Sequence, residues 1–311
     1  MIRRLEFQAG DEHERVDQFL ALKMTEFSRT RLRRAIAEGD VLLNGSPTVK
    51  GARLNPGDRV GISIPAGDRS SMTPEPIPLD ILYESEELIV VNKPAGLLVH
   101  PSNSQKSGTM CNALAYHFIQ NGGAAIRPGL LHRLDHGTSG VIAVAKTRRA
   151  HRIIARAFHQ RRVKKQYVAL VEGRVQADSG QIDAPIGRKA DVWPRWGVLS
   201  DGLPAQTLYL VRHRYVANTI LELEPLTGRT HQLRIHCAAM GHPIVGDRVY
   251  GNALCAAGEH AEPASHLLHA QQLSFCNPAT GQEMTFIAPL PAAMLDAIHR
   301  LEAQNERKNR I

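Results

Sequence analysis

The feature that most constrains the fold of this chain is a polar loop that runs directly into an apolar strand. The stretch Leu130–Gly140 reads Leu-Leu-His-Arg-Leu-Asp-His-Gly-Thr-Ser-Gly, and the apolar run Val141–Ala145 follows it. A short apolar run bounded by turn residues indicates a buried strand. Gly137 and Gly140 favour a tight bend before that strand. We therefore expect Asp135 in a polar loop a few residues before the sheet.

Asp135 is the first candidate for chemistry. His132 and Arg133 stand beside it in sequence and place switchable or positive charge near its carboxylate. A carboxylate with cationic neighbours stays ionised, which a nucleophile or a general base requires. Most loop aspartates only cap or bridge a turn, and this stretch alone does not separate the two interpretations.

Composition sets the class of protein. The chain has 311 residues, of which 43% are hydrophobic, so it can build a sizeable core and more than one domain. The N-terminus has no apolar signal core, and no apolar run is long enough to cross a bilayer. We expect a cytoplasmic protein that does not act at a membrane. The four cysteines form no Cys-x-x-Cys pair, which argues against a zinc ribbon or a disulfide scaffold.

The positive charge is concentrated in one segment. The formal net charge is +8, and residues 145–165 hold nine lysines and arginines with no acid. Apolar residues from Ala150 to Phe158 follow a helical period, so this segment is expected to form a helix that Thr147 caps. Its opposite face predicts contacts with the phosphates of a nucleic acid. That face carries Arg148, Arg152 and Arg156.

The N-terminal region predicts a separate small unit. Residues 1–10 form a leader or an edge strand, and residues 11–64 contain two helices followed by short strands. Ser28 is expected to cap the second helix, and Gly39 is expected to end it. Residues 65–78 are rich in proline, serine and polar residues and predict a flexible linker. Four arginines crowd the second helix: Arg29, Arg31, Arg33 and Arg34.

Two further stretches carry candidate site residues. Lys165-Gln-Tyr167 opens a predicted strand, where a tyrosine either packs in the core or offers an aromatic platform. Thr230 is expected to cap a helix in which Leu233 faces inward. Arg229 stands just before this helix, where its guanidinium is free to reach a carboxylate or a phosphate. The loop between residues 189 and 201, which contains Trp193 and Trp196, stays unassigned.

These stretches carry a family resemblance. The motif His-Arg-Leu-Asp-x-x-Thr-Ser-Gly resembles the signature of the RluA/RluD branch of pseudouridine synthases, and the Tyr167 and Arg229 stretches match the same family. Residues 11–64 resemble the alpha-L RNA-binding domain first seen in a ribosomal protein. The resemblance implies an α+β fold. Residues 79–303 would form a catalytic domain on a large mixed, mainly antiparallel sheet with flanking helices and a central cleft. The small α+β domain precedes it, and residues 304–311 form a tail.

The resemblance also implies an activity, the isomerisation of uridine to pseudouridine within RNA. It implies no metal and no nucleotide cofactor, and we expect a monomer. Asp135 would be the catalytic residue, and Arg229 would pair with it. Tyr167 would stack on the flipped base and help to remove the proton from its carbon, while Leu233 lines the pocket. Arg133 would fill the gap left by the base or bind phosphate. His132 is grouped with the substrate-binding residues.

Several alternatives stay open. Asp135 either attacks the sugar or the base covalently, or abstracts a sugar proton so that a glycal forms. The RNA is expected to be large-subunit ribosomal RNA, because relatives with the appended domain act on it. Transfer RNA is the alternative substrate. A non-catalytic RNA-binding or ribosome-assembly factor and an aspartate-based nucleoside hydrolase are the competing classes. His136-Gly137 departs from the usual family pattern, which leaves the target uridine undetermined.

Overall fold

The chain forms two compact units. The computed structural model describes residues 2–10, 14–24, 27, 29–65, 73–102, 105–122, 128–190, 196–251 and 263–309. Unit 1 comprises Met1–Pro74 with Ala115–Arg127, and unit 2 comprises Glu75–Leu114 with Pro128–Ile311. Ser28, Trp193 and residues 66–72 of the predicted linker lie outside the described residues.

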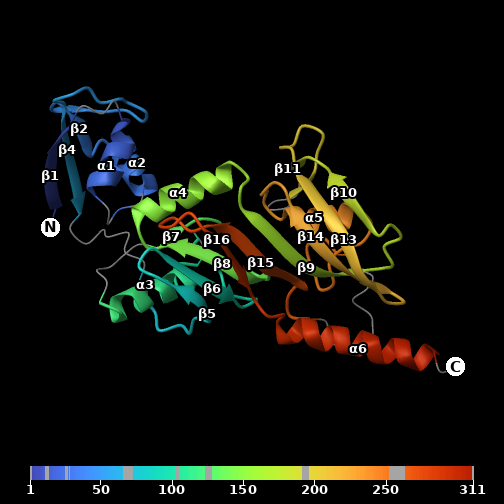
Figure 1. The fold of residues 1–311 in the computed structure, drawn as a ribbon. Helices are drawn as coiled ribbons and strands as arrows, with labels where there is room; N and C mark the ends of the chain where they lie inside the picture. The colour runs from blue at the N-terminus through green and yellow to red at the C-terminus, as the bar shows by residue number, and fades with distance from the viewer. Residues whose placement is uncertain are drawn as a thin grey trace. The chain divides into compact units, whose positions relative to one another are not determined.

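Unit 1 is a four-stranded sheet with two helices (Figure 1). The strand order is β1-β4-β2-β3, and all pairings are antiparallel. The predicted leader is therefore an edge strand, which pairs with β4 from Ile2 to Gln8. The elements are β1 (Ile2–Gln8), α1 (Val16–Lys23), α2 (Arg29–Glu38), β2 (Val41–Leu43), β3 (Ser46–Pro47) and β4 (Arg59–Pro65).

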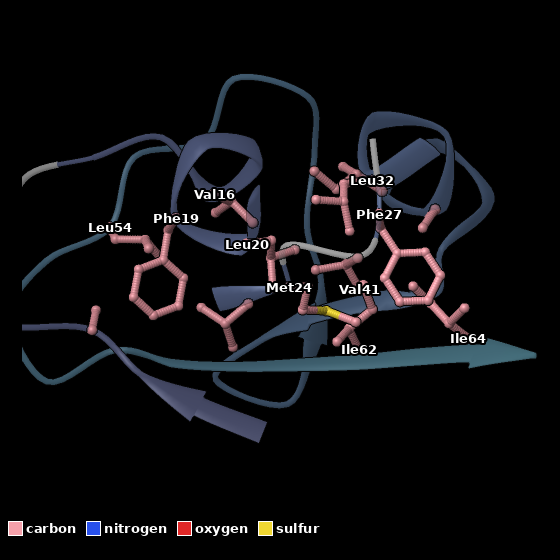
Figure 2. Packing of buried hydrophobic residues seen from close by; sticks show 14 residues of the cluster. Val16, Phe19, Leu20, Met24, Phe27, Leu32, Val41, Leu54, Ile62 and Ile64 are labelled. Atoms are coloured by element: carbon pink, nitrogen blue, oxygen red, sulfur yellow. The ribbon is translucent and has the colours of Figure 1, made fainter. Parts of the chain in front are cut away.

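The core of unit 1 lies between the two helices and the sheet, as Figure 2 shows. Leu20 of α1 and Leu32 of α2 have no exposed surface, and Val41 of β2 packs in the same cluster. Gly39 follows α2 with φ +82°, which suits the left-handed residue that commonly ends a helix. The amphipathic pattern read from the sequence therefore accounts for the packing of this unit.

Unit 2 is built on a ten-stranded mixed sheet. Its main path runs β10-β13-β14-β9-β15-β8-β6-β5, with β16 beside β15 and β7 beside β8. The pairing of β15 with β8 is parallel, and the other pairings are antiparallel. The α+β fold with a mainly antiparallel sheet is thus confirmed.

The strands of this sheet are β5 (Ile81–Glu84), β6 (Leu88–Lys93), β7 (Gly129–Leu130), β8 (Ser139–Ala145), β9 (Lys164–Glu172), β10 (Ser179–Asp183), β13 (Gln206–Arg214), β14 (Asn218–Pro225), β15 (Leu268–Cys276) and β16 (Glu283–Ile287). A separate hairpin pairs β11 (Ile186–Arg188) with β12 (Trp196–Val198). The helices of this unit are α4 (Arg148–His159), α5 (Gln232–Ala239) and α6 (Ala292–Asn309). Helix α3 (Met110–Gln120) belongs to unit 2 up to Leu114 and to unit 1 from Ala115. Helix α6 ends at Asn309, so residues 304–309 of the predicted tail are helical. No helix in the described ranges is long and apolar enough to cross a bilayer.

Helices cover both faces of the sheet at β9. Successive side chains of a strand point to opposite faces. Ala169 packs with Leu233 of α5, whereas Val168 and Leu170 pack with Met294 of α6. Helix α4 begins as predicted, because the Thr147 hydroxyl accepts a hydrogen bond from the amide of Ala150. Strand β9 is therefore buried on both sides from Val168 to Val171.

A close approach between strands fixes the loop that precedes β8. Strands β8 and β15 pair only at His269 with Ser139 and at Ala270 with Gly140. Gly140 has φ +114°, and a Cβ built there would lie 2.2 Å from the carbonyl oxygen of Ala270. Only glycine fits at this position. The glycine that ends the predicted turn thus lets the loop carrying Asp135 enter the middle of the sheet.

Candidate active site

A cavity of about 340 Å³ opens in unit 2 where three segments meet. These are the loop before β8, the start of β9, and the segment that leads from β14 into α5. All six residues predicted for the catalytic and substrate-binding positions line this one cavity: Asp135, Tyr167, Arg229, Leu233, Arg133 and His132. Residues up to 101 positions apart in sequence are therefore brought to one place, although their roles remain predictions.

Asp135 is partly buried in this cavity. Its side chain is 18% exposed, and Nη1 of Arg234 donates to its Oδ2 at 3.3 Å. The Arg234 side chain is only 7% exposed, so little water screens the pair. The guanidinium holds one oxygen of the carboxylate in place, which positions the group for general base or nucleophilic chemistry.

Arg234 is itself held by a second carboxylate. Its Nε and Nη2 donate to Oδ2 and Oδ1 of Asp247 at 2.7 and 2.8 Å, a bidentate arrangement. The amides of Val249 and Tyr250 donate to Oδ1 of the same carboxylate. Burial raises the pKa of Asp247, but the hydrogen bond and charge of Arg234 outweigh it and leave that pKa below its ordinary value. The guanidinium is thus fixed in orientation, and Nη1 is directed at Asp135.

The predicted ion pair between Arg229 and Asp135 is wrong. Arg229 donates from Nε to the carbonyl oxygen of Pro204 at 3.0 Å, and its amide donates to Gln232. Arg229 precedes α5, whereas Arg234 lies inside it on the side that faces Asp135. The sequence did hold a signal for Arg234, since an arginine among the buried residues of a helix needs an acidic partner.

Tyr167 lies half-buried at the start of β9 and lines the same cavity. Burial, and then the charge of Asp135, raise the pKa of its phenol well above the ordinary value. The phenol is therefore neutral at physiological pH. A neutral ring suits stacking against a base, whereas a phenol with so high a pKa is poorly suited to remove a proton.

His132 is not a source of positive charge beside Asp135, contrary to the prediction. Its Nε2 accepts a hydrogen bond from the amide of Ala143 at 3.1 Å, and its ring stacks on Phe158 with centroids 5.0 Å apart. Burial, and then the charge of Lys165, lower its pKa to about 3. The imidazole therefore stays neutral and connects the loop to β8 and α4.

Two buried side chains hold the Asp135 loop in place. Lys93 is 1% exposed and donates from Nζ to the carbonyl oxygen of His136 at 3.2 Å. The Thr138 hydroxyl lies 2.7 Å from Nε2 of His266, and the Thr138 amide donates to the carbonyl oxygen of Asp135. The loop thus behaves as part of the rigid scaffold, as a precisely placed reactive group requires.

The predicted RNA-binding arginines fall into two classes. Arg148, Arg152 and Arg156 are exposed on α4. Although their segment contains no acid, neighbouring cations of the segment are paired with acids from elsewhere in the chain, Lys146 with Glu84 and Arg149 with Glu87. On α2 the four predicted arginines contact acids of unit 1: Arg29 and Arg33 contact Asp17, and Arg31 and Arg34 contact Glu38.

Comparison with known proteins gives consistent matches. Residues 87–239 match the family model described as RNA pseudouridylate synthase. A protein of Aquifex aeolicus named "Uncharacterized RNA pseudouridine synthase" is 41% identical over 295 residues, which cover 91% of this chain and 92% of that protein. The "Ribosomal large subunit pseudouridine synthase D" of Nitrosomonas europaea is 40% identical over 295 residues, covering 92% of this chain and 85% of that protein. The solved structure of "Human RNA Pseudouridylate Synthase Domain Containing 1" matches with a TM-score of 0.56 and 29% identity, over 73% of this chain and 95% of that one.

Proposed function

The chain belongs to the RNA pseudouridine synthase family, and on that premise we propose that Asp135 carries out the isomerisation of uridines in large-subunit ribosomal RNA. The observation that carries the proposal is the place of Asp135, partly exposed in a cavity and ion-paired to the buried Arg234. The reaction breaks the bond between the sugar and N1 of uracil and rejoins the sugar to C5. Asp135 acts first, either as a nucleophile or by abstracting a sugar proton, and both routes need it ionised.

The other cavity residues support the same step. Arg234 orients Asp135, since its own position is fixed by Asp247. Tyr167 offers a neutral aromatic face to a base that has left its stack. Leu233 is 6% exposed and gives the cavity an apolar wall, which strengthens the electrostatic interactions near it.

The choice of ribosomal RNA rests on the relatives. The protein of Nitrosomonas europaea that matches over most of this chain is named for the large ribosomal subunit. Unit 1, with two helices and arginines on the second, is proposed to bind RNA, and the exposed arginines of α4 are proposed to contact phosphates. The relatives named above are bacterial proteins, and bacterial ribosomal RNA is modified in the cytoplasm. We therefore expect this enzyme to act in the cytoplasm.

The test uses the purified full chain and unmodified large-subunit ribosomal RNA transcribed in vitro. Pseudouridines are mapped by carbodiimide adducts that stop reverse transcription, with transfer RNA as the competing substrate. We expect pseudouridine at discrete sites in the ribosomal RNA and none with Asp135→Asn, whose RNA affinity should match that of the parent. Product formed by Asp135→Asn at the parental rate would remove Asp135 from the catalytic role. Product in transfer RNA alone would refute the ribosomal substrate.

A further inference from the structure

The proposed reaction needs a second proton transfer, which comes after Asp135 has acted at the sugar. After the sugar is rejoined to C5 of uracil, that carbon still carries its hydrogen, which must leave as a proton whichever route Asp135 takes. The phenol of Tyr167 is neutral at physiological pH, as an ordinary tyrosine is, and a neutral phenol accepts a proton poorly. A base with an available lone pair must therefore lie close to both Asp135 and the bound uracil.

His231 lines the cavity in an unusual backbone conformation. It is the residue before α5, and its φ of 56° and ψ of 20° put a non-glycine residue in the left-handed region. Such conformations cost on the order of 1–3 kcal/mol and are concentrated at functional sites. The conformation places the imidazole beside Asp135, with Nε2 3.9 Å from Oδ2 of that carboxylate.

A hydrogen bond fixes the orientation of this ring. Nδ1 of His231 lies 2.8 Å from the hydroxyl of Tyr250, and the two rings meet edge to face with centroids 5.6 Å apart. The Tyr250 ring also carries the guanidinium of Arg234, 5.0 Å from its centroid. Since Nδ1 is occupied, Nε2 is the nitrogen left to face the cavity. The side chain is 25% exposed, so a ligand in the cavity can reach it.

We propose that His231 is a further catalytic residue, whose Nε2 takes the proton from C5 of the rejoined uracil while Tyr250 holds the ring in place. This inference rests on the proposed function. In the step, the C5–H bond breaks and its proton goes to Nε2. The electron pair of that bond forms the C5=C6 double bond. The π electrons of the N1=C6 bond move to N1, which takes up a proton, so that uracil neither gains nor loses a proton overall.

The charges around His231 suit a base. Burial lowers its pKa, and Arg234 and Arg133 act in the same direction, while Asp135 and Asp247 raise it. The net shift is downward, so the imidazole is neutral at physiological pH and able to accept a proton. His266 also faces this group and is kept neutral by burial, with a pKa lowered to about 4. Asp135 then stabilises the imidazolium that forms.

His231→Asn is the most informative variant, because asparagine tolerates the left-handed conformation and removes the basic nitrogen. We expect kcat to fall by about 10²- to 10⁴-fold, the usual contribution of a general base, with little change in KM. RNA made with uridine deuterated at C5 should then react more slowly than unlabelled RNA, since proton removal becomes rate-limiting. His213→Gln, an exposed histidine on β13, is the matched control and should match the parent.

Tyr250→Phe provides a second test if His231→Asn fails to fold. It removes the hydroxyl that orients the imidazole, and it should lower kcat less than His231→Asn while also exposing an isotope effect. If the parent makes pseudouridine but both variants keep parental kcat and show no isotope effect, the role of His231 is refuted and the proposed function stands. If the parent makes no pseudouridine in any RNA, the proposed function itself fails.

Discussion

Asp17 in unit 1 and Asp135 in unit 2 are both aspartates held by arginines. They differ in exposure and in how many of their carboxylate oxygens contact a guanidinium group. The Asp17 side chain is 1% exposed, whereas that of Asp135 is 18% exposed. Both oxygens of Asp17 are occupied by guanidinium groups at 2.8–3.3 Å, from Arg15, Arg29 and Arg33. Asp135 has one guanidinium on Oδ2, and its Oδ1 has no hydrogen bond within the described part of the chain.

This difference separates a structural carboxylate from a reactive one. Three guanidinium groups use the lone pairs of Asp17, so that carboxylate can only hold α1 and α2 together. Asp135 lines a cavity, and its one guanidinium partner contacts only one of its two oxygens. The presence of arginine near aspartate is therefore uninformative by itself, and access to a cavity is what matters.

The largest effects should come from exchanging each aspartate for asparagine. Asp135→Asn is expected to abolish product formation, a loss of at least about 10³-fold or ~4 kcal/mol, and to leave stability unchanged. Asp17→Asn should destabilise unit 1 by about 3 kcal/mol, because it breaks a buried ion pair and leaves the arginines uncompensated. Urea unfolding and product formation on both variants test the comparison. A larger loss of unfolding free energy in Asp135→Asn than in Asp17→Asn would contradict the comparison.

The next largest effect concerns the two arginines of the cavity. Arg234→Lys keeps the charge but loses the bidentate contact with Asp247, so Asp135 loses its fixed partner. We expect kcat to fall by about 10- to 100-fold, the usual loss when a supporting residue around a site is changed. Arg229→Lys is the matched control, because Arg229 contacts only backbone and a glutamine, and its kcat should stay near the parental value. Equal losses in the two variants would restore Arg229 as the partner of Asp135.

A smaller effect should appear in the dependence of stability on pH. Burial raises the pKa of Asp17, but Arg29 and Arg15 outweigh it, so its folded pKa lies below the unfolded value of about 3.9. Its contribution to stability is therefore complete above that value and is lost as pH falls through the folded pKa. The difference in unfolding free energy between the parent and Asp17→Asn should be constant near neutral pH and shrink below about pH 4. A constant difference down to the lowest pH would contradict this.

The smallest effect should come from the exposed cations of α4. Replacing Arg152 and Arg156 by glutamine should weaken RNA binding and reduce the slope of log affinity against log salt by roughly one unit per residue. Arg149→Gln in the same helix is the control, because Glu87 already neutralises that guanidinium. Filter binding between low and physiological salt measures both. If the salt slope of the double variant equals that of the parent, this face of α4 does not contact the phosphates of RNA.

Much of the fold and part of the site follow from local sequence patterns. Three such features are the turn glycines before β8, the Thr147 cap of α4 and the inward face of α5. Each depends only on residues close to it in sequence, so a local pattern is enough to predict it. Asp135 and Tyr167, which the family resemblance named, line one cavity, and their roles stay predictions.

What the sequence missed depends on contacts across long distances in the chain. Arg234 reaches Asp135 across 99 positions, and no spacing rule favours it over Arg229. His132 was misread because its acceptor role depends on the amide of Ala143, in a strand that the fold brings back beside it. The number of arginines on α2 likewise did not predict that two of them form ion pairs with Asp17.

The parallel pairing of β8 with β15 has a mechanical consequence. It joins the two antiparallel halves of the sheet over just two residue pairs. One half carries Asp135, and the other carries Tyr167 and Arg234. Because the two strands share so few backbone pairs, the position of Asp135 relative to Tyr167 depends on side-chain packing across the seam. There Val141 and Ala143 of β8 lie in one core cluster with Leu273 and Phe275 of β15.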